Sequence, residues 1–210
     1  MLRARTLEAK DERRQAFLTA ALDEFFERGF AAARMDDIAR RAGLSKGALY
    51  LYFDSKEALF TALIDTIAAP NVERLERAAA AAPSATAALH ALTTFAPRLI
   101  RDTPLPRVAK VILADSRVFP DVVRRYRTQI VDRVLGIITG ILARGQESGE
   151  LAVEDPKLTA RLVVAPVILS AIWRVVFEID PEAKVDLDAL FAQHERMLLR
   201  ALAPDSGAAA

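Results

Sequence analysis

The sequence predicts an all-α protein of about nine helices, with a three-helix unit near the N-terminus and a larger helical domain after it. Two short helical patterns and a turn fit into residues 35–53. Farther along, apolar residues step by three and four positions through several long stretches up to Ala201. With 210 residues and 52% hydrophobic content, the chain can bury a sizeable core, so a globular fold is expected.

The first helix is expected from about Asp11 to Arg28, where Gly29 ends it. One side of it carries an apolar stripe made of Leu18, Ala21, Leu22, Phe25 and Phe26. A stripe of this kind buries against other helices, so this helix should support the two that follow it.

Residues 35–53 are typical of a helix-turn-helix. One face of the first motif helix is formed by apolar residues at i, i+3, i+4 and i+7, namely Met35, Ile38, Ala39 and Ala42. Gly43 ends that helix because glycine takes the left-handed conformation without a Cβ penalty. Ser45 is then a favourable N-cap for the second motif helix.

The second motif helix, from Lys46 to Phe53, has an unusual outward side. By spacing only Leu49 and Phe53 face inward, and the other positions carry a lysine, two tyrosines and small or apolar residues, with no acid. This composition suits DNA. Serine, tyrosine and lysine donate to phosphate oxygens, glycine and alanine allow close approach to base edges, and an apolar side chain can touch a thymine methyl.

Five segments around this motif carry a resemblance to a known family: Gly29–Phe30, Asp37–Ala39, Ala42–Tyr50, Tyr52–Phe53 and Ser55–Leu59. They are similar to the N-terminal domain of TetR/AcrR-family transcriptional regulators, without a gap. The resemblance implies that the second motif helix is a recognition helix. It also implies that Lys46, Tyr50, Tyr52 and Lys56 contact DNA.

Two places depart from the pattern of that family. Its members commonly have Thr-Thr or Thr-Ser where this chain has Ala33-Arg34, and histidine is frequent at the position of Tyr52. Arg34 is expected to replace the lost hydroxyl contact to a phosphate. The candidate DNA contacts are Arg34, Met35, Ser45, Lys46, Gly47, Ala48, Tyr50, Leu51, Tyr52 and Lys56.

The predicted DNA-binding domain covers residues 11–71, with the helix-turn-helix motif at 34–53, and residues 72–204 form the predicted ligand-binding and dimerisation domain. Net charge is only +1, from 29 Lys and Arg against 28 Asp and Glu, so DNA affinity must come from a local patch. An N-terminal arm with Arg3 and Arg5 is expected to extend that patch into a minor groove. Residues 205–210 are expected to be disordered.

An alternative hypothesis explains the same residues without DNA. A turn of this kind also joins short helices in domains that bind nothing, and Tyr50 and Tyr52 are acceptable core or interface aromatics. The chain would then be a helical small-molecule-binding or interaction protein without sequence-specific DNA activity. The ungapped series of matching positions favours the regulator.

Capping residues, proline and glycine divide the rest of the chain into helices. A fourth helix, capped by Asp54 or Ser55, is expected to connect the two domains. Pro120 opens a long helix that ends at Gly149, and Asp155-Pro156 is a strong start for the next one.

Two C-terminal helices predict a dimer. Residues 162–173 contain few polar side chains, so their helix is expected to be covered on both sides, by its own core and by a second subunit. The last helix, from Leu187 to Ala201, has a similarly wide apolar face. Together they suit a four-helix interface in a homodimer, which the family resemblance also implies.

A small-molecule effector is expected between helices of the C-terminal domain. The candidate pocket residues are aromatic and aliphatic side chains with one guanidinium: Phe95, Leu99, Tyr126, Ile130, Trp173, Arg174 and Phe177. Arg174 has three open roles: receiving an acidic ligand, pairing across the dimer, or extending to water. Gly136 and Gly140 indicate close packing or room for a bound molecule, and we favour packing.

Enzymatic and metal-dependent functions are not expected. Cysteine is absent, and His90 and His194 lie on separate predicted helices, so we predict no metal site and no cofactor. GLSKG at residues 43–47 matches a nucleophile-elbow pattern, but that elbow follows a strand and a helix precedes it here.

The protein is expected in the cytoplasm and not in a membrane. Residues 1–14 alternate charges without an apolar leader. The apolar stretch 162–173 holds Pro166 and is expected to be too short to span a bilayer. The predicted function is therefore a transcriptional regulator, acting as a repressor that binds a palindromic double-stranded operator as a homodimer and is released by a small molecule.

Overall fold

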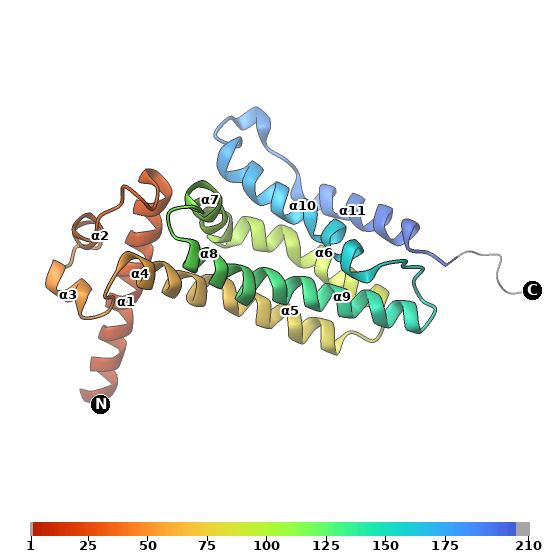
Figure 1. Ribbon diagram of the computed structural model, residues 1–210, viewed down its shortest axis with the longest axis horizontal. Helices are drawn as coiled ribbons and strands as arrows, with labels where there is room; N and C mark the ends of the chain where they lie inside the picture. Colours follow the sequence, from red (N-terminus) through yellow and green to blue (C-terminus); the bar gives the residue numbers. More distant parts are fainter. Residues whose placement is uncertain (1, 205–210) are drawn as a thin grey trace, which may run out of the picture. The chain divides into compact units, whose positions relative to one another are not determined.

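The structure, a computed structural model, describes residues 2–204, with side chains from Glu8 onward (Figure 1). Its α-helices are α1 (Leu2–Arg28), α2 (Met35–Arg41), α3 (Lys46–Tyr50), α4 (Lys56–Leu63), α5 (Ala69–Ala81), α6 (Ala85–Asp102), α7 (Leu105–Asp115), α8 (Pro120–Tyr126), α9 (Asp132–Glu147), α10 (Pro156–Val176) and α11 (Leu187–Ala201). Single π-helical turns join α4 to α5 at Ile64–Ala68 and α8 to α9 at Arg127–Val131, and Pro181–Ala183 is a 3₁₀ turn. Within residues 2–204 this makes nine helical rods and no strand, which confirms the all-α prediction.

The chain divides into two compact units. Unit 1 contains the residues up to Ala68 together with Arg107–Tyr126, and unit 2 contains Ala69–Pro106 and the residues from Arg127 onward. The sequence predicts residues 107–126 as part of the C-terminal domain, and that division stays a prediction. They belong to unit 1 because the Phe119 ring packs 4.1 Å from the Phe30 ring, and Asp115 Oδ2 accepts a 2.6 Å hydrogen bond from the Phe30 N–H.

Helix α1 is longer than expected. It begins at Leu2 instead of Asp11, so the backbone of the predicted arm is helical. The added residues are mainly leucine, arginine, alanine, glutamate and lysine, which have high helix propensity even without an apolar stripe. The side chains of Arg3 and Arg5, and residues 205–210, lie outside the described part, so the predictions for them stay open.

The core of unit 1 is aromatic. Phe17 and Phe25 of α1 and Phe60 of α4 are at most 1% exposed, and the Phe25 ring lies 5.1 Å from Phe30 and 5.6 Å from Phe60. Burying each of these rings stabilises the fold by about 1.5–3 kcal/mol. Ile38 of α2, also fully buried, attaches the motif to this core.

The turn of the motif forms as the sequence predicts. Gly43 has φ +69°, and the Leu44 N–H donates to the Ala39 carbonyl at 3.0 Å, which closes α2. The Ser45 hydroxyl accepts from the Ala48 N–H at 3.1 Å and so caps α3. Helix α3 ends at Tyr50, three residues earlier than expected, and the chain continues as a turn to Phe53.

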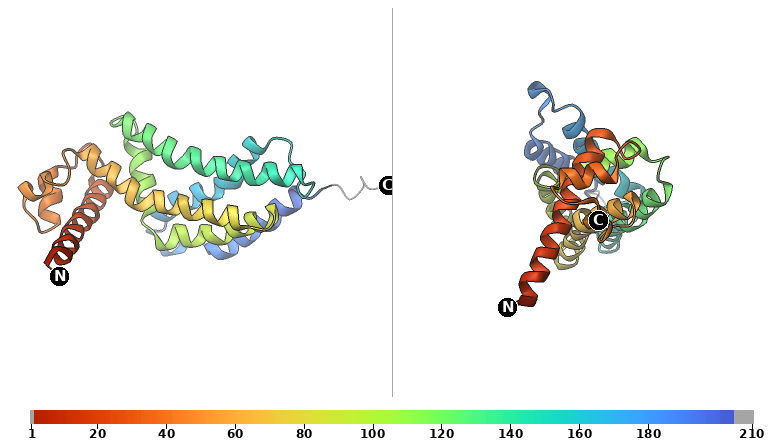
Figure 2. Two further views of the ribbon diagram at one scale, coloured as in Figure 1. Left: turned by 90° about the horizontal axis from the view of Figure 1, so that it is seen from below. Right: turned by 90° about the vertical axis from the view of Figure 1, so that its left-hand side faces the viewer.

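Unit 2 is a bundle of α5, α6, α9, α10 and α11. Helices α5 and α9 run side by side, in yellow and green in Figure 2, and α10 packs on α9 while α11 packs on α6. Its close-packed glycine is Gly145, where a Cβ would lie 2.5 Å from Leu151. At Gly136 and Gly140 a Cβ would meet nothing within 4 Å, so the packing expected there is not made within the chain.

Helix α10 begins as predicted, with Asp155 Oδ1 accepting from the Lys157 N–H at 2.8 Å and the Leu158 N–H at 3.0 Å. It is 21 residues long, and by length and composition alone it could cross a membrane. The predicted apolar stretch 162–173 is only the middle of this helix. One side of this helix is exposed and apolar. We call its large side chains the α10 apolar face, made of Leu158, Leu162, Ile168, Leu169 and Trp173.

Candidate nucleic-acid interface

Helix α3 has one buried residue and a broad exposed side. Leu49 is fully buried and anchors the helix to unit 1. Tyr50 is 43% exposed and Leu51, the C-cap, is 85% exposed. We call the exposed side the recognition surface, made of Ser45, Lys46, Gly47, Tyr50 and Leu51. It contains donors and apolar groups but no acid, as the sequence predicts.

Lys46 forms an ion pair with Asp36, which the sequence did not predict. Its Nζ lies 2.8 Å from Asp36 Oδ1 and 3.0 Å from Asp36 Oδ2, and both side chains are exposed. This hydrogen bond raises the pKa of Lys46 above its ordinary value. A phosphate must compete with Asp36 for Lys46. No local spacing rule connects positions ten residues apart across a turn, so only the folded motif reveals this pair.

Three of the candidate DNA contacts have side chains that are buried, half-buried or already bound within the chain. The Met35 side chain is 8% exposed and packs in the core of unit 1, and its prediction as a DNA contact stays a prediction. The Lys56 Nζ donates to the carbonyls of Phe30 at 2.8 Å and Ala31 at 3.1 Å, so it already holds the turn after α1. Tyr52 is half-buried, with its ring 5.7 Å from that of Phe17.

Arg34 is exposed at the start of α2. It is the N-cap residue, with extended φ and ψ of −117° and 142°, and its side chain makes no capping hydrogen bond. Among the described residues, none forms a hydrogen bond or ion pair with its guanidinium. Ala48 is half-buried and its N–H is used by the Ser45 cap.

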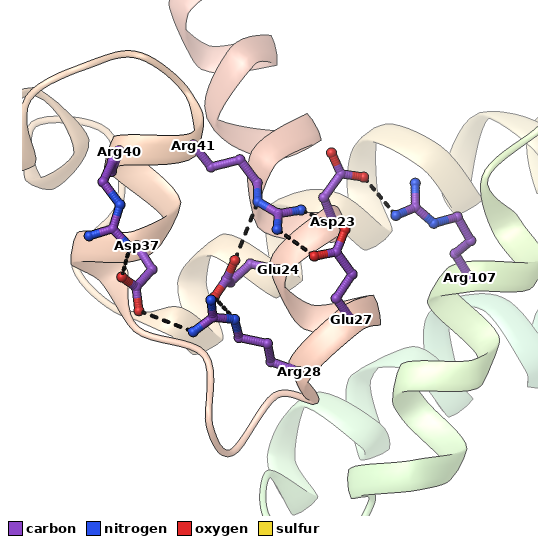
Figure 3. A network of polar contacts seen from close by, with 8 residues as sticks. All are labelled: Asp23, Glu24, Glu27, Arg28, Asp37, Arg40, Arg41 and Arg107. Atoms are coloured by element: carbon purple, nitrogen blue, oxygen red, sulfur yellow. Dashed lines mark hydrogen bonds and ion pairs between the residues drawn. The ribbon is translucent and has the colours of Figure 1, made fainter.

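A network of ion pairs fixes α2 against α1 (Figure 3). Its centre is Glu24, whose side chain is 2% exposed and lies 3.0 Å from Arg28 Nε and 3.3 Å from Arg41 Nε. Arg41 also donates to Glu27 Oε1 at 2.8 Å, and this hydrogen bond lowers the pKa of Glu27. A buried carboxylate is stable only when it is paired, so Arg41 holds the motif on its support helix.

The same network reaches α2 and α7 from its two ends (Figure 3). Asp37 pairs with Arg40 on α2 and lies 3.9 Å from Arg28 Nη1. Asp23 Oδ1 accepts a 2.6 Å hydrogen bond from Arg107 on α7. These contacts join α2 to α1 and α1 to α7 within unit 1.

The predicted ligand residues do not gather in one pocket. A pocket of about 270 Å³ between α5 and α6 is lined by Phe95 but by none of the other six. Ile130 is buried and Leu99 is half-buried, while burial raises the pKa of Tyr126 to about 12.

The other three predicted ligand residues lie at the C-terminal end of α10. The Trp173 and Phe177 rings are 4.8 Å apart, and Trp173 Nε1 donates to the Ala183 carbonyl at 2.7 Å. Arg174 donates to the carbonyl of Arg101 at 3.1 Å, so its guanidinium has a partner within the chain.

The two histidines are engaged separately in unit 2. His90 Nδ1 lies 2.6 Å from Glu195 Oε1, and His194 Nε2 lies 3.1 Å from the Val163 carbonyl. Among the described residues, no group of three His, Cys, Asp or Glu side chains is arranged to hold a metal ion.

Two family models match the chain. Residues 17–63 match the family described as bacterial regulatory proteins, tetR family, and residues 87–201 match the AefR-like transcriptional repressor C-terminal domain. The second match alone covers more than half of the 210 residues.

Individual proteins are also similar to this chain. The chain is 51% identical over 55 residues to the HTH-type transcriptional activator FasR of Mycolicibacterium smegmatis, which covers 26% of this chain and 25% of FasR. Among solved structures, FadR from Bacillus subtilis in complex with stearoyl-CoA matches with TM-score 0.69 and 23% identity, covering 89% of this chain and 98% of FadR. The SmeT–triclosan complex matches with TM-score 0.74 and 24% identity, covering 92% and 93%.

The helix-turn-helix geometry, the helical C-terminal bundle and both family matches lead to one assignment, which is a regulator of transcription and not an enzyme. The chain belongs to the TetR/AcrR family of transcriptional regulators.

Proposed function

We propose that this protein is a repressor that binds a palindromic DNA operator as a homodimer and leaves it when a small molecule binds the C-terminal unit. The observation that carries the proposal is the recognition surface, an exposed helix side with donors, an open glycine and a leucine, and without an acid. Solvent-facing helix sides without a partner normally carry charged residues of both signs.

In this proposal the contacts divide into two kinds. Arg34, Ser45, Lys46 and Tyr50 donate to phosphate oxygens and set the position of the motif on the duplex. Gly47 and Leu51 meet base edges in the major groove. Met35, Ala48, Tyr52 and Lys56 support these groups from within unit 1, because their side chains are buried, half-buried or bound to the backbone.

The α10 apolar face supports the homodimer. Leu162 and Leu169 are 70% and 65% exposed in the single chain, and on α11 Met197 is 61% exposed. Fully burying a leucine stabilises an association by about 1.5–3 kcal/mol. A two-fold dimer buries the same patch on both subunits, and it presents two recognition helices to half-sites about 34–36 Å apart on one side of B-DNA.

An effector would act by binding better to the state whose recognition helices no longer match that spacing. FadR and SmeT, whose structures contain stearoyl-CoA and triclosan, support a small molecule with a large apolar part as the effector class. The AefR-like C-terminal match supports repression, although FasR is named an activator. A DNA-binding regulator of this family acts in the cytoplasm.

A gel shift with promoter DNA from the chain's own gene tests the proposal. The parent protein should bind, Lys46→Ala and Tyr50→Ala should bind weakly, and Lys184→Ala, an exposed lysine before α11, should bind like the parent. Binding should fall steeply as salt rises, because phosphate contacts release counterions. If the parent binds no duplex at low salt, the non-DNA alternative is favoured, and the uncapped start of α2 at Arg34 agrees with it.

A further inference from the structure

Gly47 has no structural reason to be glycine. It lies in the first turn of α3 and is not among the glycines with positive φ, which are Gly29, Gly43 and Gly149. A Cβ at Gly47 would meet nothing within 4 Å. Alanine favours a helix more than glycine does, so the chain forgoes helix stability here without a gain in its own packing.

Leu51 is the second unexplained residue. Its side chain is 85% exposed, although a leucine normally gains from burial. Its backbone is helical, with φ −71° and ψ −18°, and it follows Gly47 by four positions. Residues four apart lie on the same side of a helix, so the open space at Gly47 and the Leu51 side chain are neighbours.

We propose that Gly47 and Leu51 together recognise one thymine in each half-site through its C5-methyl group. This inference rests on the proposed function. The missing side chain at Gly47 lets a base edge approach the α3 backbone, and Leu51 then contacts the methyl, which is the apolar group that thymine presents in the major groove. Lys46 and Tyr50, on the neighbouring side of α3, hold the adjacent phosphates.

Uracil substitution tests the methyl contact directly. A duplex is first selected from a random pool by the full-length protein, and each thymine is then replaced singly by deoxyuridine, which lacks only the methyl. At one position per half-site, binding should weaken about fourfold, the equivalent of about 0.8 kcal/mol for one buried methyl. In Leu51→Ala the same replacement should have no effect. Leu113→Ala, which truncates a 61% exposed leucine on α7, should keep the parent's sensitivity.

Gly47→Ala separates recognition from folding. The variant should bind the selected duplex about tenfold more weakly, a loss typical of one disturbed base pair, while its thermal midpoint stays equal or rises. The matched control is Gly136→Ala on α9, where a Cβ also meets nothing, and it should keep the parent's affinity. A residue needed only for folding would lower the thermal midpoint and the affinity together.

The outcomes distinguish this inference from the proposed function. If no duplex is selected, the proposed function is wrong and the inference falls with it. If a duplex is selected but every thymine can be replaced by deoxyuridine without loss, the inference alone is wrong. The inference is also wrong if Leu51→Ala still loses affinity, as the parent does, when the thymine at that position is replaced by deoxyuridine.

Discussion

The recognition surface and the α10 apolar face are both exposed, but they differ in composition. The first combines hydroxyl and amine donors with one glycine and one leucine on a five-residue helix. The second lies on a 21-residue helix and consists of leucines, an isoleucine and a tryptophan whose indole N–H is already used within the chain. Exposure alone therefore does not identify a partner. Mixed donors and apolar groups suit a duplex, whereas a wide apolar side suits a second copy of the chain.

The two surfaces also differ in what holds them. Helix α3 is short, and its position depends on one buried leucine, a serine cap and the ion pairs that fix α2 to α1. Helix α10 is backed by Ala160 and Val163, both fully buried in the core of unit 2. Removing a charged residue should therefore affect the first surface more. Replacing an apolar residue should affect the second surface more.

The largest expected effect comes from placing charges on the α10 apolar face. Leu162→Glu combined with Leu169→Glu should convert the dimer to a monomer, because each interface would then bury charges without partners. DNA affinity should fall by about two orders of magnitude or more, since two half-sites are no longer bound together. Light scattering after gel filtration measures the mass, and Leu113→Glu is the matched control. If the parent protein is a monomer, the α10 apolar face does not form a homodimer interface.

A smaller effect is expected from breaking the ion-pair network. Arg41→Ala leaves the buried Glu24 with Arg28 alone, so the thermal midpoint should fall by roughly 5 °C and DNA affinity should fall with it. Adding Glu24→Gln should recover part of the loss, because a neutral amide does not need a cation. Thermal unfolding followed by circular dichroism measures the thermal midpoint of both variants, and a DNA titration measures the affinity. No recovery in the double variant would mean that Arg41 acts through packing and not through Glu24.

Removing the competitor of Lys46 should strengthen DNA binding. In Asp36→Asn the lysine is released and an acid near the phosphates is lost, so affinity at low salt should rise about three- to tenfold. Titrations over a range of salt concentrations check this, and the gain should shrink as salt rises. If Asp36→Asn weakens binding without lowering the thermal midpoint, the ion pair positions Lys46 for DNA and does not compete with it.

The smallest expected effect is on stability in acid and concerns a helix cap in unit 2. Glu150 accepts hydrogen bonds from the Ala85 and Thr86 N–H groups at the start of α6, both at 2.8 Å. A hydrogen bond from the Thr86 side chain, together with these backbone N–H groups, lowers the pKa of Glu150 to about 2. A lowered pKa means that the carboxylate stabilises the fold above about pH 4.5 and that this contribution is lost as pH falls toward 2. Glu150→Gln should remove that part of the pH dependence, measured by urea unfolding from pH 6 to 2. If the free energy of unfolding of Glu150→Gln depends on pH as it does in the parent, the capping role of Glu150 is contradicted.

The local features of the fold were predictable from the sequence. Gly43 ends α2, and Ser45 and Asp155 cap α3 and α10, because each acts through backbone groups within three residues. The membership of residues 107–126 in unit 1 was not predictable, since periodicity tells which side of a helix is apolar but not which helix it meets.

The candidate site was predicted in outline. The exposed residues of α3 follow from spacing around Leu49, but Met35 lies one turn from Ile38 on the buried side, and Lys56 reaches back 26 residues to a carbonyl. The pairing of Lys46 with Asp36 likewise depends on how the turn folds. Long-range contacts of polar side chains decide which predicted donors remain available.

The most direct measurement is the stoichiometry and footprint of the protein on a duplex that it selects. We predict two chains per duplex and two protected segments in successive major grooves, about 34–36 Å apart on one side of the helix, lost in Tyr50→Ala. A single chain bound to one protected segment, or full protection retained in Tyr50→Ala, would contradict the account.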